Sequence, residues 1–217
     1  MIGEFFLLSS QINRKIREEF HNEKDLILDL GCGEDPKYHK MMKGRIRCLD
    51  LYKNKKAHVI ADADKLPFKP DSFDKAISVN SFYYFKNPFN VAKDLGKILK
   101  KNGKLVVVVP FFYPIHDAPF DNYRFTEYGI RNLFKENFDI EGIDTIGGIF
   151  SLPSVILHSI IKGTPLLFRG FFRDAVKIFV YLVFYIPYIL SQFLEIFNIL
   201  DRTGRVPVYY LALMSKK

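Results

Sequence analysis

The feature that most constrains the fold is an apolar strand that runs into two glycines one residue apart. Residues 26–30 are apolar except for Asp29, and Gly31, Cys32 and Gly33 follow directly. Glycine has no Cβ, so the backbone here can turn sharply and lie close to a ligand. Such a turn is typical of the first strand of a nucleotide-binding α/β sheet. Pro36 stands where a dinucleotide-binding turn has its third glycine, which favours a different adenosine-bearing ligand.

Apolar runs alternate with helical patterns along the chain. Strands are predicted over residues 26–30, 45–51, 57–61, 73–79, 104–109, 140–146 and 206–214, and helices over 5–20, 88–100 and 126–137. Pro88 suits a helix start, and Thr126 is a suitable N-cap. Continuous apolar strands that alternate with helices predict an α/β fold with a mostly parallel sheet covered on both faces.

Acidic residues follow two of the predicted strands. Asp50 ends the second strand, and Asp62 with Ala63 follows the third. Carboxyl ends of parallel strands share one edge, so both acids are expected beside the glycine turn. An acid after the second strand can bind both ribose hydroxyls. An Asp-Ala pair can offer an acceptor and a backbone N–H to an adenine edge. Each acid alone is more often a turn or helix cap.

These motifs resemble the class I S-adenosylmethionine-dependent methyltransferases of the type 11 kind, over residues 20–148 and the last strand. The resemblance implies a single domain, 1–217, with a Rossmann-like seven-stranded sheet whose last strand is antiparallel and lies beside the sixth. It implies S-adenosylmethionine as the cofactor. The residues implied to bind it are Asp29, Gly31, Cys32, Gly33, Asp50, Leu51, Asp62 and Ala63, with Asn80 and Ser81 bordering the site.

The loop after the fifth strand, residues 110–126, should lie over the reacting centre. Methyl transfer needs an aligned nucleophile and removal of a hydroxyl proton. His116 is the candidate general base, oriented by Asp117 or Asp121, and Arg124 can hold an anionic group or anchor the loop. A role for His116 in structuring the loop or orienting the substrate has similar weight. The spacing resembles methyltransferases of glycan or lipid-linked saccharide pathways, which suggests a lipid-linked acceptor methylated at oxygen.

Residues 149–205 are an insert that the core fold does not require, and 149–200 are strongly apolar. The last strand must rejoin the sheet, which argues against a single membrane crossing. Residues 150–217 hold eight Lys and Arg against three acids. Peripheral contact with an anionic membrane is therefore predicted, with a lid over an apolar pocket and a dimer interface as alternatives. A thin polar stripe is expected at Lys177, Tyr181, Tyr185, Tyr188, Gln192 and Glu195.

The net charge of +8 permits an anionic partner or reflects a Lys-rich surface. An RNA methyltransferase is thus one alternative, although nucleic acid is not the expected partner. A non-catalytic membrane-associated scaffold is another. Two cysteines and scattered histidines predict neither a disulfide framework nor a metal site. We therefore expect a cytoplasmic protein, peripheral on the cytoplasmic face of a membrane, and the sequence leaves its oligomeric state open.

Overall fold

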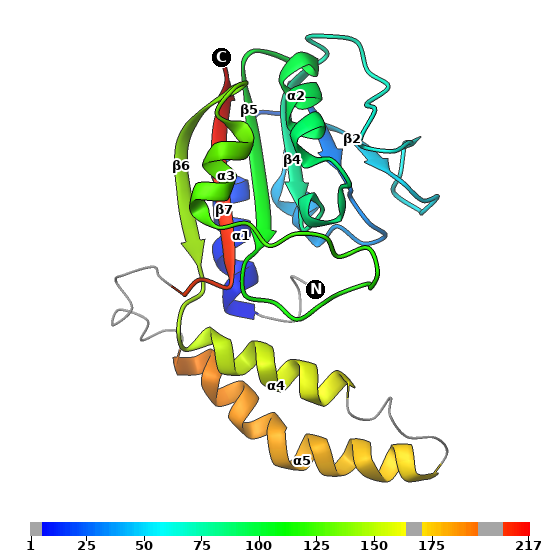
Figure 1. The fold of residues 1–217 in the computed structure, drawn as a ribbon, viewed down its shortest axis with the longest axis vertical. Helices are drawn as coiled ribbons and strands as arrows, with labels where there is room; N and C mark the ends of the chain where they lie inside the picture. The colour runs from blue at the N-terminus through cyan, green and yellow to red at the C-terminus, as the bar shows by residue number, and fades with distance from the viewer. Residues whose placement is uncertain (1–5, 164–170, 195–205) are drawn as a thin grey trace.

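The computed structural model describes residues 6–163, 171–194 and 206–217. Its centre is one seven-stranded sheet in the order β3-β2-β1-β4-β5-β7-β6 (Figure 1). The first five strands in this order, from β3 at the edge through β2, β1 and β4 to β5, pair in parallel. Strand β7 lies antiparallel between β5 and β6. The predicted Rossmann-like sheet with an antiparallel last strand is therefore confirmed.

The strands are β1 (Leu26–Leu30), β2 (Arg45–Asp50), β3 (Val59–Ile60), β4 (Phe73–Val79), β5 (Leu99–Pro110), β6 (Phe138–Ile146) and β7 (Tyr209–Lys216). The helices are α1 (Phe6–Glu19), α2 (Pro88–Ile98), α3 (Glu127–Phe134), α4 (Ser151–Gly163) and α5 (Phe171–Leu194), with short 3-10 turns η2 (Lys37–Met41) and η3 (Phe82–Tyr84).

Alternating side chains of the central strands fill two cores. Val107 and Val109 of β5 pack with α2 and α3 on one face, whereas Val106 and Val108 pack with α1 on the other. Successive residues of a strand point to opposite faces, so a run of four valines supplies both cores. This explains why the strand reads as continuously apolar.

Several strand boundaries differ from the prediction by one or two residues, and the largest differences are at the starts of β5 and β7. β5 begins at Leu99, because Leu99 already pairs with Phe73 of β4 before the irregular stretch that ends at Lys104. The last strand begins at Tyr209 and not at residue 206. Pro207 has no N–H to give to a neighbouring strand, so regular pairing starts only beyond it.

The insert forms a helical hairpin of α4 and α5 that follows β6 and precedes β7. Figure 1 shows it beyond the edge at which the parallel strands end, on the same side as the loop after β5. Tyr188 of the predicted polar stripe is buried and faces His158 of α4, with ring centroids 5.9 Å apart. Helix pairing therefore turns this member of the polar stripe inward. Glu195 lies outside the described residues.

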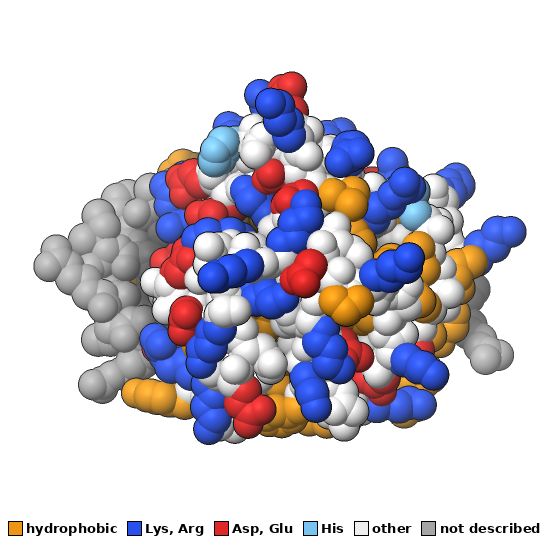
Figure 2. Space-filling model, turned by 90° about the horizontal axis from the view of Figure 1, so that it is seen from above, with side chains coloured by type: hydrophobic (Ala, Val, Ile, Leu, Met, Phe, Trp, Pro, Cys, Tyr) orange, Lys and Arg blue, Asp and Glu red, His pale blue; other side chains and the backbone are white. Residues whose placement is uncertain are grey.

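The opposite end of the sheet has a different surface. Figure 2 shows it from above, with Lys and Arg side chains interspersed with Asp and Glu. Apolar side chains and mixed charges therefore occupy opposite ends of the molecule.

Candidate functional site

The carboxyl ends of four strands meet at one edge of the sheet. The Gly31 N–H donates to the Leu49 carbonyl at 2.8 Å, and the Ala61 N–H donates to the Asp50 carbonyl at 3.0 Å. On the other side of β1, the Asn80 N–H donates to the Val108 carbonyl at 2.9 Å. The segments that follow β1, β2, β3 and β4 are thereby held side by side, as a nucleotide site of this fold requires.

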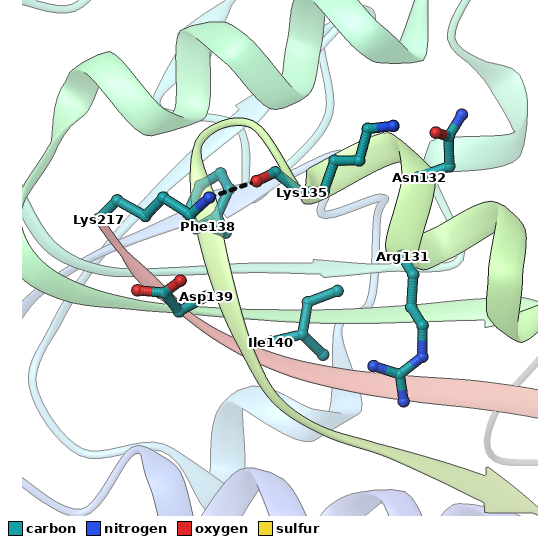
Figure 3. Close-up of a pocket in the computed structure, with 7 residues that line it drawn as sticks. All are labelled: Arg131, Asn132, Lys135, Phe138, Asp139, Ile140 and Lys217. Atoms are coloured by element: carbon teal, nitrogen blue, oxygen red, sulfur yellow. Dashed lines mark hydrogen bonds between the residues drawn. The ribbon is translucent and has the colours of Figure 1, made fainter.

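A hollow of about 510 Å³ lies elsewhere, between α3 and the start of β6. Figure 3 shows Arg131 from α3, Lys135 just after that helix and Asp139 from β6 around it. It is wide open and belongs to the end of the sheet where the parallel strands begin. It is therefore not part of the candidate site.

The glycine turn is fixed by its backbone conformation and by the end of β4. Gly31 and Gly33 have φ angles of +74° and +65°, a region that side-chain-bearing residues rarely adopt. A Cβ on Gly31 would lie 2.3 Å from the Ser81 Oγ, whereas a Cβ on Gly33 would meet nothing within 4 Å. The Ser81 hydroxyl donates to the Gly31 carbonyl at 2.8 Å. Ser81 thus ties β4 to the turn, and Gly33 borders open space.

The Asp50 carboxylate lies beside the turn, as predicted. It accepts the Gly33 N–H at 2.8 Å and the Tyr52 N–H at 3.2 Å. The Cys32 thiol is 4.0 Å from the same carboxylate. The pKa of the Cys32 thiol is raised by its contact with the Cys48 thiol and by burial. Cys32 is therefore a neutral packing group, while the Asp50 oxygens keep lone pairs for further donors.

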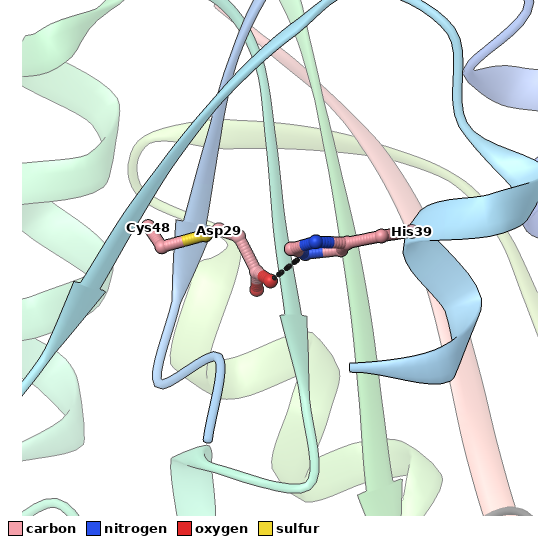
Figure 4. Close-up of side chains that lie close together, drawn as sticks. All are labelled: Asp29, His39 and Cys48. Carbon is pink, nitrogen blue, oxygen red and sulfur yellow. Dashed lines mark hydrogen bonds and ion pairs between the residues drawn. The ribbon is translucent and has the colours of Figure 1, made fainter. Parts of the chain in front are cut away.

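Asp29 is completely buried beneath the turn and is held by two residues that the sequence analysis did not single out. It accepts the Tyr38 hydroxyl at 2.8 Å, and it pairs with His39 Nε2 at 2.5 Å (Figure 4). Burial raises the pKa of Asp29, and both partners oppose that effect. Cys48 completes a cluster whose potential metal-ligand atoms lie within 4.8 Å of one another. The Asp29 carboxylate and the His39 ring already pair with each other, so Asp29 anchors η2 under the turn.

Two further observations test whether this edge fits an adenosine-bearing ligand. The Asn80 side-chain oxygen is buried without a hydrogen-bond partner among the described residues. Across the edge, Asp62 is exposed and accepts the Asp64 N–H at 3.0 Å, while Ala63 is buried. A buried oxygen without a donor and an open approach at Gly33 are what a ligand with polar edges would complete. The residues fit S-adenosylmethionine.

The loop after β5 is closed by an ion pair. Asp121 and Arg124 make two hydrogen bonds, one of them 2.7 Å from Nη2 to Oδ2. Arg124 also donates to the Pro114 carbonyl at 3.2 Å, and the His116 N–H donates to Asp121 at 2.8 Å. The Arg124 guanidinium lowers the pKa of Asp121. The Asp121–Arg124 pair, called the loop clasp below, therefore shapes the loop and fixes the backbone at His116.

The His116 ring has different partners. Its Nδ1 is 2.7 Å from the Tyr84 hydroxyl and 2.9 Å from an Asp117 carboxylate oxygen. Of the two acids considered for orienting the ring, Asp117 is the one that contacts it. Tyr84 was missed because η3 is distant in sequence. The aromatic run 82–85 directly after β4 is the signal that could have identified it.

Comparisons with known proteins agree with this geometry. Residues 28–107 match the profile of the methyltransferase domain family. An uncharacterized protein of Methanocaldococcus jannaschii is 29% identical over 150 residues, which are 64% of each chain. A second protein of that organism is 29% identical over 135 residues, 58% of this chain and 49% of its own length. The chain thus spans less than two thirds of the curated relatives it matches.

Solved structures share the fold at low identity. The [4+2]-cyclase SpnF has a TM-score of 0.63 at 14% identity, over 95% of this chain and 80% of its own. Phosphoethanolamine N-methyltransferase 2 of Haemonchus contortus, solved with S-adenosyl-L-methionine, has a TM-score of 0.58 at 16% identity, over 95% and 52%. Proteins named for different reactions share this architecture, so the reaction has to be argued from the site.

Proposed function

We propose that this chain is a class I S-adenosylmethionine-dependent methyltransferase and that it methylates an oxygen of a lipophilic or lipid-linked acceptor, with a saccharide as the favoured class. The observation that carries the proposal is the apolar α4–α5 hairpin at the same end of the molecule as the glycine turn (Figure 1). An acceptor bound there meets an apolar surface and the cofactor edge together.

The cofactor is S-adenosylmethionine, which supplies a methyl group on a sulfonium sulfur that leaves as a neutral thioether. The residues assigned to its site, either as contacts or as supports of the turn, are Asp29, Gly31, Cys32, Gly33, Asp50, Leu51, Asp62, Ala63, Asn80 and Ser81. Asp50 has the lone pairs for ribose hydroxyls, and Gly33 permits close approach of the backbone. Ser81 and Asp29 support the turn from below, one through Gly31 and the other through η2.

His116 has the role of general base toward the acceptor hydroxyl. As the acceptor oxygen bonds to the methyl carbon, the hydroxyl proton moves to the imidazole, and a methyl ether forms. General-base assistance of this kind contributes roughly 100- to 10,000-fold. Asp121 and Arg124 act on the backbone of the loop. If His116 only structures the loop, its replacement will change acceptor affinity and leave the rate at saturation unchanged.

The proposed membrane contact rests on the exposed apolar side chains of α5. The inward positions of this helix, Val176, Val180, Phe184 and Tyr188, recur every four residues toward α4 and the domain. Twelve other large apolar side chains of α5 are exposed, among them Leu182 and Ile186 at 73% each. The others are Phe172, Ile178, Phe179, Tyr181, Val183, Tyr185, Ile189, Leu190, Phe193 and Leu194. Residues 172–191 are long and apolar enough to cross a membrane by length and composition. Only 17% of this apolar window is buried inside the protein, so most of it is available for contact with lipid.

The exposed apolar positions cover more than half of the helix circumference at about 100° per residue. A protein partner usually covers one stripe, whereas lipid surrounds every outward side. No charged residue occurs from 178 to 194, and Arg173 and Lys177 stand near the start of the helix. We therefore assign this surface to one leaflet that contains anionic lipid. The 13-residue α4 is only about 20 Å long, too short to cross back, so α5 lies in the leaflet plane.

The absence of tryptophan from the chain permits a direct test of this contact. Ile186→Trp places one fluorophore on the exposed side of α5, and Phe89→Trp places one on exposed α2. With phosphatidylcholine vesicles containing a quarter phosphatidylglycerol, the first should shift to the blue and be quenched by brominated acyl chains. The second should do neither. Membrane docking would be excluded if the fluorescence of Trp introduced at position 186 did not shift. It would also be excluded if sedimentation showed a dimer whose interface covers α5.

The acceptor is tested with methyl-labelled S-adenosylmethionine. We expect label in polyprenyl-phosphate-linked saccharides presented in vesicles, and little in the same saccharides free in solution. Transfer should fall steeply with His116→Gln. Equal labelling of the free saccharides would reduce the apolar surface to a lid over the substrate pocket.

Two other functions are separated by the same assays. The net positive charge favours RNA, whose binding would fall steeply with salt, unlike apolar docking. The mixed charges in Figure 2 argue against a continuous basic track on that face. A non-catalytic scaffold would bind S-adenosylhomocysteine and label none of these acceptors. Labelling of RNA in preference to lipids would overturn the proposed acceptor class.

A further inference from the structure

Two side chains from two segments meet at one nitrogen of the His116 ring. Tyr84 comes from η3 after β4, and Asp117 comes from the loop after β5. The Tyr84 hydroxyl is 2.7 Å from His116 Nδ1 and 2.9 Å from Asp117 Oδ2. The third side of the triangle, from Nδ1 to that carboxylate oxygen, is 2.9 Å. The neighbouring Asn122 binds the η3 backbone through the Tyr83 and Tyr84 carbonyls, which fixes the two segments together.

The shared hydrogens of this triangle can be assigned from charge. If Nδ1 carried no proton, its lone pair would face a carboxylate oxygen at 2.9 Å, and the two would repel. If Nδ1 carries the proton, it can donate to the carboxylate, and the Tyr84 hydroxyl can donate to the same oxygen. The second arrangement satisfies every group in the triangle, so it is the one that the distances favour.

We propose that Tyr84 and Asp117 are positioning residues that keep the proton of the neutral His116 ring on Nδ1 and leave the Nε2 lone pair free. This inference rests on the proposed function, since it supplies the free nitrogen that a general base needs. The proton taken from the acceptor hydroxyl then goes to Nε2, and the resulting imidazolium is stabilised by the Asp117 carboxylate. Neither residue needs to touch the acceptor.

The other charged groups near the ring leave this arrangement in place. Asp121 is paired with Arg124, and its contact with His116 is to the backbone N–H. Arg124 also lies over the Tyr83 ring, 5.4 Å from its centroid. Burial, followed by the contacts with Tyr83 and Asp117, raises the pKa of Tyr84. Its hydroxyl therefore stays protonated and available as a donor throughout the pH range of a folded protein.

The test reads the ring directly and needs no acceptor. Nitrogen-15 spectra of the histidine rings are recorded at alkaline pH, where imidazoles are neutral, and His116→Gln identifies the His116 signals. The intact chain should show the Nδ1–H form. Asp117→Gly removes the carboxylate and tolerates the φ of +55° at this position. In that variant Tyr84 can donate to Nδ1, so the ring should change to the Nε2–H form.

Tyr84→Phe should keep the Nδ1–H form, because Asp117 still accepts that proton. The double variant with Asp117→Gly lacks both partners, so hydrogen bonding should no longer favour one ring tautomer over the other. Tyr128→Phe, at an exposed position of α3, is the control and should match the intact chain. Amide spectra of each variant establish that it is folded. An Nε2–H ring in the intact chain, or no change in Asp117→Gly, would overturn the proposal. Because no acceptor is present, these results are independent of the acceptor assays.

Discussion

The two halves of the carboxyl edge are built in different ways. In the cofactor half, made of the segments after β1 to β4, backbone groups hydrogen-bond directly from strand to strand, as Gly31 does with Leu49. In the acceptor half, made of the loop 111–126 with α4 and α5, side-chain contacts such as the Asp121–Arg124 pair add to the backbone hydrogen bonds of the loop, and α5 leaves apolar surface exposed. The cofactor half is thus largely complete in itself, and the acceptor half presents a surface that needs a partner.

The contrast separates cofactor binding, in the first half, from acceptor specificity, in the second. Backbone hydrogen bonds hold the cofactor half in place, and the glycine turn leaves no room for a side chain at Gly31. Small steric changes there should therefore have large effects. The acceptor half depends on one clasp, one polar triangle and an exposed helix, which can be altered singly. If the two halves are as independent as they look, a change in one should leave the binding function of the other intact.

The largest effect is expected from a single methyl group at the turn. Gly31→Ala would place a Cβ against Ser81 in a backbone conformation with positive φ. We expect a loss of about 100-fold or more in affinity for S-adenosylhomocysteine and a loss of roughly 2–4 kcal/mol in unfolding free energy. Calorimetric titration and urea unfolding measure the two.

The matched control is Gly33→Ala, which has the same kind of φ but open space around the new Cβ. It should cost about 1 kcal/mol of stability. Equal losses at both glycines would show that backbone conformation, and not the contact with Ser81, governs the turn. Gly31→Arg that retained full affinity would contradict the assignment of the site itself.

Next in size is the loss of vesicle binding when charges replace exposed apolar side chains on α5. Each fully buried side chain of this kind contributes about 1.5–3 kcal/mol. The double change Leu182→Glu with Ile186→Glu should therefore weaken binding to anionic vesicles about 100-fold, as measured by flotation. S-adenosylhomocysteine affinity should stay unchanged. Phe89→Glu, an equivalent change on α2, should leave vesicle binding intact, and a loss there would show that the contact is not specific to the hairpin.

Replacement of Asp50 comes third. Asp50→Ala removes the acceptor of the Gly33 and Tyr52 N–H groups and the partner expected for the ribose. Hydrogen bonds to charged groups contribute about 1.5–3 kcal/mol, so affinity for S-adenosylhomocysteine should fall roughly 10- to 100-fold. Asp94→Ala, at a partly exposed ion pair on α2, serves as the control. Vesicle binding should be the same in both variants.

The smallest effect concerns pH and the loop clasp. The pKa of Asp121 is lowered in the folded chain by Arg124, so its stabilising contribution is present above the ordinary value of about 4 for a free aspartate. The contribution is lost as the pH falls toward the lowered value. Hydrogen exchange at the His116 amide, which donates to Asp121, should lose protection over that range relative to unfolded peptide. Arg124→Gln should remove the pH dependence, and protection that persists in acid would contradict the clasp.

Local patterns were sufficient for the cofactor half. The strand before Gly31 and the acids at the ends of β2 and β3 follow from short segments whose chemistry depends on their immediate neighbours, and so does the N-cap at Thr126 outside that half. The Thr126 side chain accepts the Gly129 N–H at 3.1 Å, as the pattern of the helix start indicates. The start of β5 was misplaced because its first residue pairs with Phe73, a partner 26 positions away.

The glycine turn, the alternation of strands and helices, and the apolar nature of the insert could be predicted from short-range patterns, because these features depend on backbone freedom at glycine and on hydrophobic period. The folded chain was needed to reveal that Tyr84 and Asp117 share the His116 ring, that Tyr38 and His39 hold Asp29, and that Tyr188 faces inward while Ile186 is exposed. These contacts join segments that meet only when sheet order and helix pairing are set. A period along one helix does not state which side a neighbouring helix will cover.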